Sequence, residues 1–359
     1  MKKHTWLRIK LIFSLAIASS IIALAVALCL YPAGTIVRVI FDSNLKATGH
    51  SQLIPSWFEE AAARHSAWAQ DYLDSDVAET VSHTEVAATE WPMFGSVFFL
   101  VTAQELHEQG QVDATQGIIG EAVERSAGII ASPKTATWVR TKWGDDYLER
   151  ENVFYRMLLI MGLSSYQSIT GDVRHHALMS QQRESLAAEL YQAKWHLLDD
   201  YPYECWPNDI LWAVVAIQRA AALDGANYAV LAASFMESFN RAPVLVSGLP
   251  AAQMMSRTGH VVQNPRGCGN SGILMFAGEL DPSIAQNWYS AYERDFWKDN
   301  GWLAGFTELA RGDTEKLMDV DSGPVIFEFG SVASVFGIGA ANASGRLDHS
   351  VPLTMQSVA

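Results

Sequence analysis

The chain has few cysteines and few basic residues for its length. Three of its 359 residues are cysteine, and Lys and Arg number 25 against 39 Asp and Glu, for a formal net charge of -14. The first ten residues hold four bases and no acid, so the remainder carries 21 bases against 39 acids, or -18. Such a surface repels a phosphate backbone, so we expect no nucleic-acid partner. At 49% hydrophobic residues, the chain nevertheless has enough apolar surface to require a large core.

The spaced motifs of several chemistries are also missing. The sequence contains no His-Glu-x-x-His pair, no closely spaced cysteine pair and no acidic calcium loop. It contains no P-loop, no dinucleotide-binding glycine fingerprint and no Gly-x-Ser-x-Gly elbow. We therefore expect neither a metal ion nor a cofactor.

One long uncharged run lies near the N-terminus, at residues 11–30. At 1.5 Å per residue it reaches across a hydrocarbon layer of about 30 Å. Residues 1–10 are basic, and the positive-inside rule keeps such a tail in the cytoplasm. The pattern predicts a transmembrane anchor in a lipid bilayer, and so a single-pass protein of the bacterial inner (cytoplasmic) membrane with a periplasmic C-terminal domain. A cleaved signal peptide ending near Ala25-Val26-Ala27 is the alternative.

Two cysteines lie beyond this run, Cys205 and Cys268. In an oxidising compartment they would either form one structural disulfide or remain as two thiols, one of them catalytic. The sequence leaves both possibilities open.

Helical periodicity dominates from residue 51 onward, and clean period-two runs are scarce. After a linker at 31–50 we expect an all-α domain at 51–349 and a tail at 350–359. Only residues 242–264 look irregular or weakly stranded. The predicted helices are 57–73, 91–108, 114–131, 152–169, 174–198, 209–223, 228–240, 271–280, 284–297 and 325–341.

The predicted helices alternate in character. Residues 152–169 are apolar nearly all round, whereas 174–198 have one apolar stripe, so the first must be enclosed by other helices. Short turns join such pairs, for example Thr170-Gly171-Asp172. This repeated hairpin resembles the (α/α)6 toroid, and Tyr166 to Asp172 resembles the Tyr-x-x-x-Thr-Gly-Asp turn of carbohydrate-processing toroids. A plain helical array is the alternative.

If inner and outer helices are antiparallel, the loops that precede the inner helices meet at one end of the domain. These loops span 143–151, 199–209, 264–271 and 319–324, and they are rich in acids, aromatics and glycines. We expect Glu204, Asp209 and Asp321 to act as general acids and bases there. Helix capping is the alternative role for Asp209 and Asp321.

Other residues of the same loops are candidates for binding. Trp143, Tyr201, Tyr203 and Trp206 offer flat surfaces to a sugar ring or an apolar ligand, with core packing as the alternative. Arg266 is suited to clamp a carboxylate, or else to neutralise nearby acids. Asp145 lies in the loop that holds Trp143, and we count it with the binding residues.

Three functions fit this sequence. The toroid resemblance implies an acid-base enzyme, a hydrolase or lyase acting on a glycan, with Glu204 or Asp209 opposite Asp321. Tyr203-Glu204-Cys205 with Cys268 is similar in kind to the cysteines, acids and tyrosines of the linalool dehydratase/isomerase family. That resemblance implies a lyase or isomerase of a small apolar alcohol, with Cys205 and Cys268 as free thiols. The third function is a non-catalytic binding or scaffold module.

Overall fold

The computed structural model describes residues 2–82, 85–313 and 322–357. These residues are mostly helical with a few short strands, which confirms the prediction of an all-α fold. The first half contains α1 (Lys2–Ile40), α2 (Ser43–Thr48), α3 (Ile54–Asp74), α4 (Val77–Thr80), α5 (Val86–Thr89), α6 (Trp91–Glu108), α7 (Gly117–Ala131), α8 (Thr137–Trp143) and α9 (Val153–Thr170). The second half contains α10 (His176–Gln192), the 3-10 helix η1 (Lys194–His196), α11 (Pro207–Ala222), α12 (Ala229–Phe239), α13 (Gly267–Leu280), α14 (Pro282–Phe296), α15 (Ser331–Ala343) and α16 (Leu347–Ser357).

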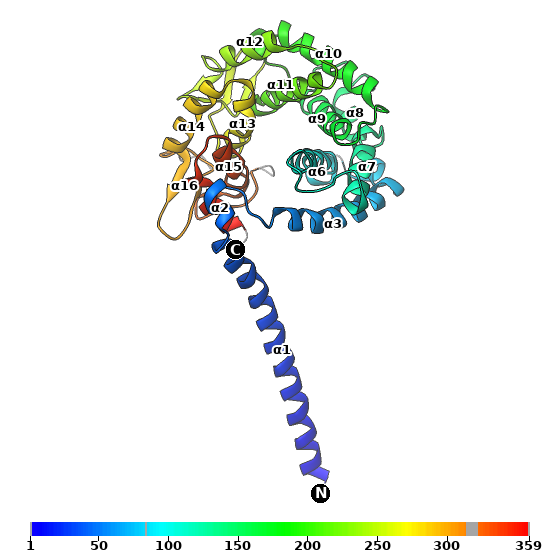
Figure 1. Ribbon diagram of the computed structural model, residues 1–359, viewed down its shortest axis with the longest axis vertical. Helices are drawn as coiled ribbons and strands as arrows, with labels where there is room; N and C mark the ends of the chain where they lie inside the picture. The colour runs from blue at the N-terminus through cyan, green and yellow to red at the C-terminus, as the bar shows by residue number, and fades with distance from the viewer. Residues whose placement is uncertain (1, 83–84, 314–321, 358–359) are drawn as a thin grey trace.

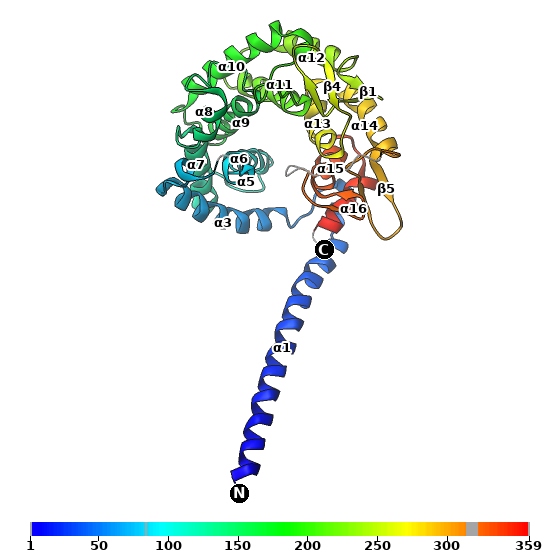
Figure 2. The same cartoon turned by 180° about the vertical axis from the view of Figure 1, so that it is seen from behind.

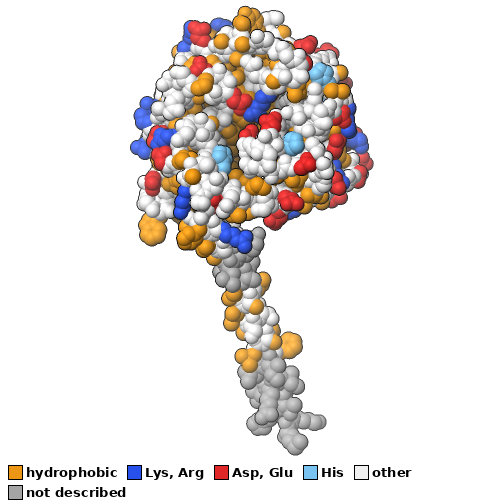
Figure 3. Space-filling view, in the orientation of Figure 1, with side chains coloured by type: hydrophobic (Ala, Val, Ile, Leu, Met, Phe, Trp, Pro, Cys, Tyr) orange, Lys and Arg blue, Asp and Glu red, His pale blue; other side chains and the backbone are white. Residues whose placement is uncertain are grey.

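Successive helices take inner and outer places around a ring, from which α1 projects (Figures 1 and 2). The inner helices are α6, α9, α11, α13 and α15, and each packs on the next. The outer helices are α3, α7, α10, α12, α14 and α16. Side chains fill the space that the ribbon leaves open at the ring centre, as the space-filling view shows (Figure 3).

The contrast between inner and outer helices follows from their side chains. Inner helix α9 buries residues on every face, from Val153 to Ile169, because other helices surround it. Outer helix α10 buries a single stripe that includes Met179, Leu186 and Leu190. A helix that is apolar on every face therefore belongs to the inner layer of the ring.

The turn between α9 and α10 has a local, structural role. Gly171 ends α9 with φ +70°, a left-handed conformation that glycine adopts without strain. The Tyr166 hydroxyl donates to Asp172 Oδ2 (3.2 Å), and the Thr170 hydroxyl donates to the Tyr166 carbonyl (2.8 Å). The Tyr-to-Asp motif therefore closes a helix end and does not line the rim described below.

Four two-stranded antiparallel hairpins interrupt the helices. The region expected to be weakly stranded contains β1 (Leu245–Val246) with β2 (Leu249–Pro250), and β3 (Gln253–Met255) with β4 (His260–Gln263). The other two hairpins are β5 (Trp297–Asp299) with β6 (Ala304–Phe306), and β7 (Val325–Ile326) with β8 (Phe329–Gly330). In the last one Val325 pairs with Gly330. The predicted helix start at 325 is therefore wrong, because six residues there form a hairpin and α15 begins at Ser331.

The prediction of a membrane anchor is also corrected. Among the described residues, no helix combines the length and the apolar character needed to cross a bilayer. This finding overturns the single-pass inner-membrane location predicted from residues 11–30.

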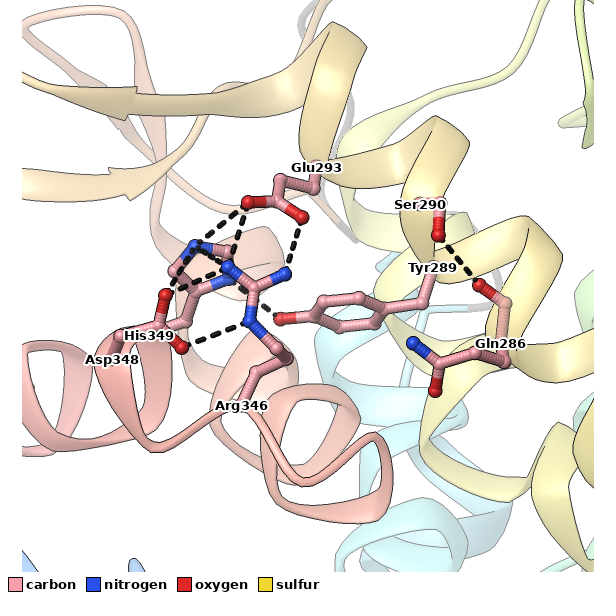
Figure 4. Close-up of polar contacts among 7 residues, drawn as sticks. All are labelled: Gln286, Tyr289, Ser290, Glu293, Arg346, Asp348 and His349. Atoms are coloured by element: carbon pink, nitrogen blue, oxygen red, sulfur yellow. Dashed lines mark hydrogen bonds and ion pairs between the residues drawn. The ribbon is translucent and has the colours of Figure 1, made fainter.

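The two ends of the ring meet at a seam beside α2, at the base of the projecting α1 (Figure 1). Helix α16 packs on α15 and α2, so the region predicted as a C-terminal tail is helical up to Ser357. Figure 4 shows a polar cluster that ties α14 to α16. Arg346 pairs with Glu293 (Nη2 to Oε1, 2.7 Å) and with Asp348 (Nε to Oδ1, 2.9 Å), and the Tyr289 hydroxyl lies 2.8 Å from His349 Nδ1.

Candidate functional site

The loops that precede the inner helices are joined to one another by hydrogen bonds. The Tyr201 hydroxyl, in the loop before α11, donates to Glu90 Oε1 (2.5 Å) directly before α6. In the same loop, the Asp199 carbonyl accepts from the backbone N–H of Val153, the first residue of α9 (3.2 Å). The N-terminal ends of α6, α9 and α11 therefore share one rim of the ring.

A buried ion pair stands where α13 begins at the same rim. Glu308 and Arg266 expose only 2% and 3% of their side chains. Arg266 donates from Nε to Glu308 Oε1 (2.9 Å), and its Nη2 lies 2.8 Å from the same oxygen in an ion pair. The Cys268 thiol donates to the same oxygen (3.0 Å), and the Cys268 backbone N–H donates to Oε2 (3.1 Å). One carboxylate thus holds both a guanidinium and a half-buried thiol.

Two glycines allow this close packing. Gly267 donates its backbone N–H to the Glu308 carbonyl (2.9 Å), and a Cβ on it would lie 2.1 Å from the Thr307 carbonyl. Gly330, directly before α15, lies against the carboxylate, since a Cβ there would be 2.9 Å from Glu308 Oε2. The Tyr292 hydroxyl donates to the Gly267 carbonyl from α14 (2.9 Å). The starts of α13 and α15 are therefore built around Glu308.

Helix α11 brings a second group of acids and a second thiol. Asp200 is fully buried, and burial together with the charge of Asp209 raises its pKa well above 3.8. Cys205 is also fully buried, and its carbonyl accepts from Met254 N (2.9 Å). Burial raises the pKa of the Cys205 thiol well above 9.0, and nearby Asp200 adds to the shift. Cys205 is therefore held as a neutral core thiol, and neither it nor Cys268 is in a disulfide.

The predicted site residues divide between the rim interior and the surface. Arg266 and Cys268 meet at Glu308, while Asp209 lies in the first turn of α11, half-buried and close enough to Asp200 to shift its pKa. No side-chain cap is made at the start of α11, whose N-cap is Trp206. The capping role considered for Asp209 is therefore not observed at this N-cap.

The aromatic candidates have different surroundings. Trp143 is half-buried and donates from Nε1 to the Asp200 carbonyl (3.2 Å). Trp206 is also half-buried, and its backbone N–H donates to Asp200 Oδ2 (2.6 Å). Tyr201 packs on Trp138 and Phe154.

Three of the predicted site residues lie at the surface instead. Tyr203 is 75% exposed, with φ +74°. Glu204 and Asp145 are exposed as well, and Glu204 pairs through its backbone with Tyr201 across a turn. Asp321 lies outside the described residues.

The middle of the ring is aromatic. Phe98 on α6 stacks on Phe336 of α15 (ring centroids 5.7 Å apart), and both lie against Trp212 of α11. Phe94 stacks on Trp212, and Phe276 of α13 meets it edge-on (5.4 Å). Each of these inner helices therefore turns an aromatic side chain toward a shared apolar layer.

A cavity of about 540 Å³ lies at the opposite ends of the inner helices. Its lining includes Val101 and Glu108 of α6, Ser168 of α9, Arg219 of α11 and Glu279 of α13. Because these residues come from the C-terminal parts of their helices, the aromatic layer separates the cavity from the rim that holds Glu308.

Several carboxyl groups of the rim were not among the predicted site residues, including Glu308, Glu90 and Asp200. Glu308 is the single charged residue in the apolar stretch 302–310, and that isolation is the signal that would have singled it out. Glu90 precedes an inner helix and falls under the same loop argument as the other candidates. Within the part of the chain that the structure describes, no cluster of three or more His, Cys, Asp or Glu side chains could hold a metal ion.

Comparison with known proteins assigns no relative to this chain. No protein-family model matches it, and no curated protein is significantly similar to it. The geometry of the rim is therefore the basis for inferring a function.

Proposed function

We propose that this protein is an (α/α)6-type toroid enzyme that removes or migrates a hydroxyl group on a small, largely apolar alcohol by acid-base chemistry. The site is the rim at the starts of α11, α13 and α15. The observation that carries the proposal is the contact of the Cys268 thiol with Glu308, 3.0 Å from Sγ to Oε1.

The thiol and the carboxylate are suited to act together as a base. The Glu308 carboxylate accepts the hydrogen bond from Sγ, and buried Arg266 favours its charged form. Cys268 lies in the first turn of the 14-residue helix α13, where the partial positive charge of the helix end favours a thiolate. Glu308 therefore stays charged and orients Sγ, the thiol proton passes to solvent, and the thiolate can then take a proton from a carbon of the substrate.

The remaining chemistry requires an acid. In a dehydration, the hydroxyl gains a proton, the C–O bond breaks, water leaves, and the electron pair of the broken C–H bond forms a double bond. In a migration, water adds again at another carbon. Asp209 in the first turn of α11 and Asp200 in the loop before it are carboxyl groups of this rim that could supply the proton.

The substrate class follows from the apolar layer next to the rim. Phe94, Phe98 and Phe336 are partly exposed and converge on Trp212. Aromatic side chains bind an apolar skeleton over a large area with little loss of side-chain freedom. A hydrocarbon placed there would have its hydroxyl end directed to the acids and the thiol.

A glycan hydrolase or lyase has less support from this geometry. That reading relied on Glu204 or Asp209 facing Asp321, but Glu204 is exposed and Asp321 lies outside the described residues. Free thiols also favour the alcohol, because a disulfide between Cys205 and Cys268 would have ruled out a thiol base.

The test is a turnover screen on the full-length protein. Short tertiary and allylic alcohols, with linalool as one probe, are incubated beside neutral and anionic oligosaccharides, and products are identified by mass spectrometry. We expect an alkene or a rearranged alcohol, and we expect Cys268→Ser and Glu308→Gln each to lower kcat by about 100-fold or more.

Glu279→Gln is the matched control, since it changes an exposed carboxylate at the far end of α13. Turnover of glycans alone, binding of alcohols without turnover, or full activity in Cys268→Ser would each refute the proposal. Because Glu308→Gln leaves Arg266 without its buried partner, folding is checked by circular dichroism, and the milder Cys268→Ser variant decides the outcome if Glu308→Gln unfolds.

A further inference from the structure

Asp200 is a fully buried carboxyl group with one oxygen left without a partner. Its Oδ2 accepts the backbone N–H of Trp206 at 2.6 Å. Its Oδ1 has no hydrogen-bond partner among the described residues, although the side chain is 0% exposed. A buried polar atom without a partner costs free energy, so it calls for a functional explanation.

The surroundings of Asp200 are acidic. Asp209, Asp199 and Glu204 all disfavour its ionised form, and Cys205 and Tyr201 beside it are neutral groups. No described Lys, Arg or His lies within ion-pair distance of the Asp200 carboxyl. Two further carboxylates lie at the starts of neighbouring helices. Glu90, directly before α6, accepts from the Tyr201 hydroxyl, and Glu151, before α9, accepts from the backbone N–H of Asp199. Burial and the charge of Asp209 raise the pKa of Asp200, which favours the protonated carboxyl, and the O–H of that form needs an acceptor.

Asp200 and Asp209 are held around the same residue. Trp206 donates its backbone N–H to the Asp200 carboxyl and accepts at its carbonyl from the Asp209 N–H (2.9 Å). When two carboxyl groups lie this close, they titrate as a pair and retain one proton between them. Asp209 is half-buried while Asp200 is enclosed, so Asp209 is the member that can meet a ligand.

The pair faces the helix that carries Cys268. Asn208 donates from Nδ2 to Asp209 Oδ1 (3.1 Å), and its own Oδ1 lies against Gly272 of α13. Gly272 is one turn after Cys268 on the same face of that helix. Asn208 therefore connects Asp209 to α13, the helix that carries Cys268.

We propose that Asp200 is the proton-holding residue of this site, a positioning residue that supplies a proton through Asp209 to the hydroxyl that leaves the substrate. This inference rests on the proposed function. The proton moves from Asp200 to Asp209 and on to the hydroxyl oxygen, the C–O bond breaks with release of water, and the proton from carbon passes to the Cys268 thiolate. The thiol then loses its proton to solvent and Asp200 takes one up from solvent, so both groups are restored and no other reactant is needed.

The first measurement needs no substrate. Infrared spectra of the full-length protein at pH 7 are compared between wild type and Asp200→Asn, with Asp71→Asn, which changes an exposed aspartate, as the matched control. We expect the C=O stretch of a protonated carboxyl in the wild type, absent from Asp200→Asn and unchanged in Asp71→Asn. If the wild type lacks this band, or if Asp200→Asn retains it, the inference is overturned even when the enzyme is active.

The second measurement uses the alcohol that the screen identifies. We expect Asp200→Asn to lower kcat by about 100-fold, to leave KM nearly unchanged and to abolish the fall in kcat toward alkaline pH. An ester of the same alcohol, whose leaving group needs no proton, should restore turnover in Asp200→Asn. An unaltered pH profile of kcat in Asp200→Asn, or an equal loss of kcat with the alcohol and with the ester, would overturn the proton-holding role. A carboxyl band without any turnover would instead count against the proposed function alone.

Discussion

Cys205 lies just before α11 and Cys268 in the first turn of α13, and the two cysteines differ in environment. Cys205 is enclosed on every side, whereas Cys268 is half-buried beside Glu308 and in the first turn of α13. A thiol reacts as its thiolate, so burial suppresses the reactivity of one cysteine and the helix end promotes that of the other.

We therefore predict selective alkylation of the native protein. Iodoacetamide at mildly alkaline pH should label Cys268 within minutes and leave Cys205 unlabelled until denaturant is added. Peptide mass mapping gives the two rates separately, and the unfolded protein serves as the control in which both react alike. Equal labelling in the native state would contradict the burial of Cys205.

At the scale of elements, the start of α13 depends on a glycine. A methyl group on Gly267 would meet the Thr307 carbonyl, which is backbone and cannot rotate away, and that carbonyl belongs to the segment carrying Glu308. Two residues on, Gly269 has open space around it in the same helix. The two glycines form a matched pair for measuring the effect of this contact.

We expect Gly267→Ala to lower the free energy of unfolding by about 1–3 kcal/mol, the typical cost of overpacking. Gly269→Ala should raise it by about 0.5–1 kcal/mol, because alanine favours a helix over glycine where no clash opposes it. Urea titration of both variants measures the difference. Similar effects from the two substitutions would mean that the contact with Thr307 can relax.

Element boundaries also show how far sequence reasoning reaches. Helices with a clear stop, such as the one ended by Gly171, follow from local residues. The β7–β8 hairpin does not, because its turn places Phe327 and Glu328 at φ +52° and +75°, where Asn-Gly is the usual signal. The convergence of loops follows from alternating helices, but Glu308 lies just after β6, and its ion pair with Arg266 joins segments that are 42 residues apart in the sequence.

At the scale of the whole molecule, buried histidines connect elements that close the ring. His65 on α3 lies 2.8 Å from Ser126 Oγ on α7 and stacks on Phe99 of α6, and burial lowers its pKa to about 4. His349 on α16 bonds Tyr289 of α14, and its pKa is lowered by burial and by Arg346.

These shifts predict loss of stability in acid. The ordinary pKa of histidine is 6.5, so below this value the unfolded chain takes up protons that the folded ring does not. The contribution of His65 is fully present above pH 6.5 and is lost as the pH falls toward about 4. The urea concentration at the midpoint of unfolding should fall as the pH is lowered from 7 to 4, and it should fall less steeply in His65→Gln. A slope unchanged by this substitution would show that other groups determine it.

The seam between α2 and α16 has a topological consequence. The Asn342 side chain donates to the Gly49 carbonyl (3.4 Å), so the two ends of the ring are neighbours in space, while α1 projects away from them (Figure 1). The ring should therefore form even when a different one of its loops carries the chain ends. A circularly permuted chain, joined across the seam and opened at the exposed Gly171 turn, would retain every inner helix and the acid-thiol rim, because the new ends would fall in an outer turn remote from both.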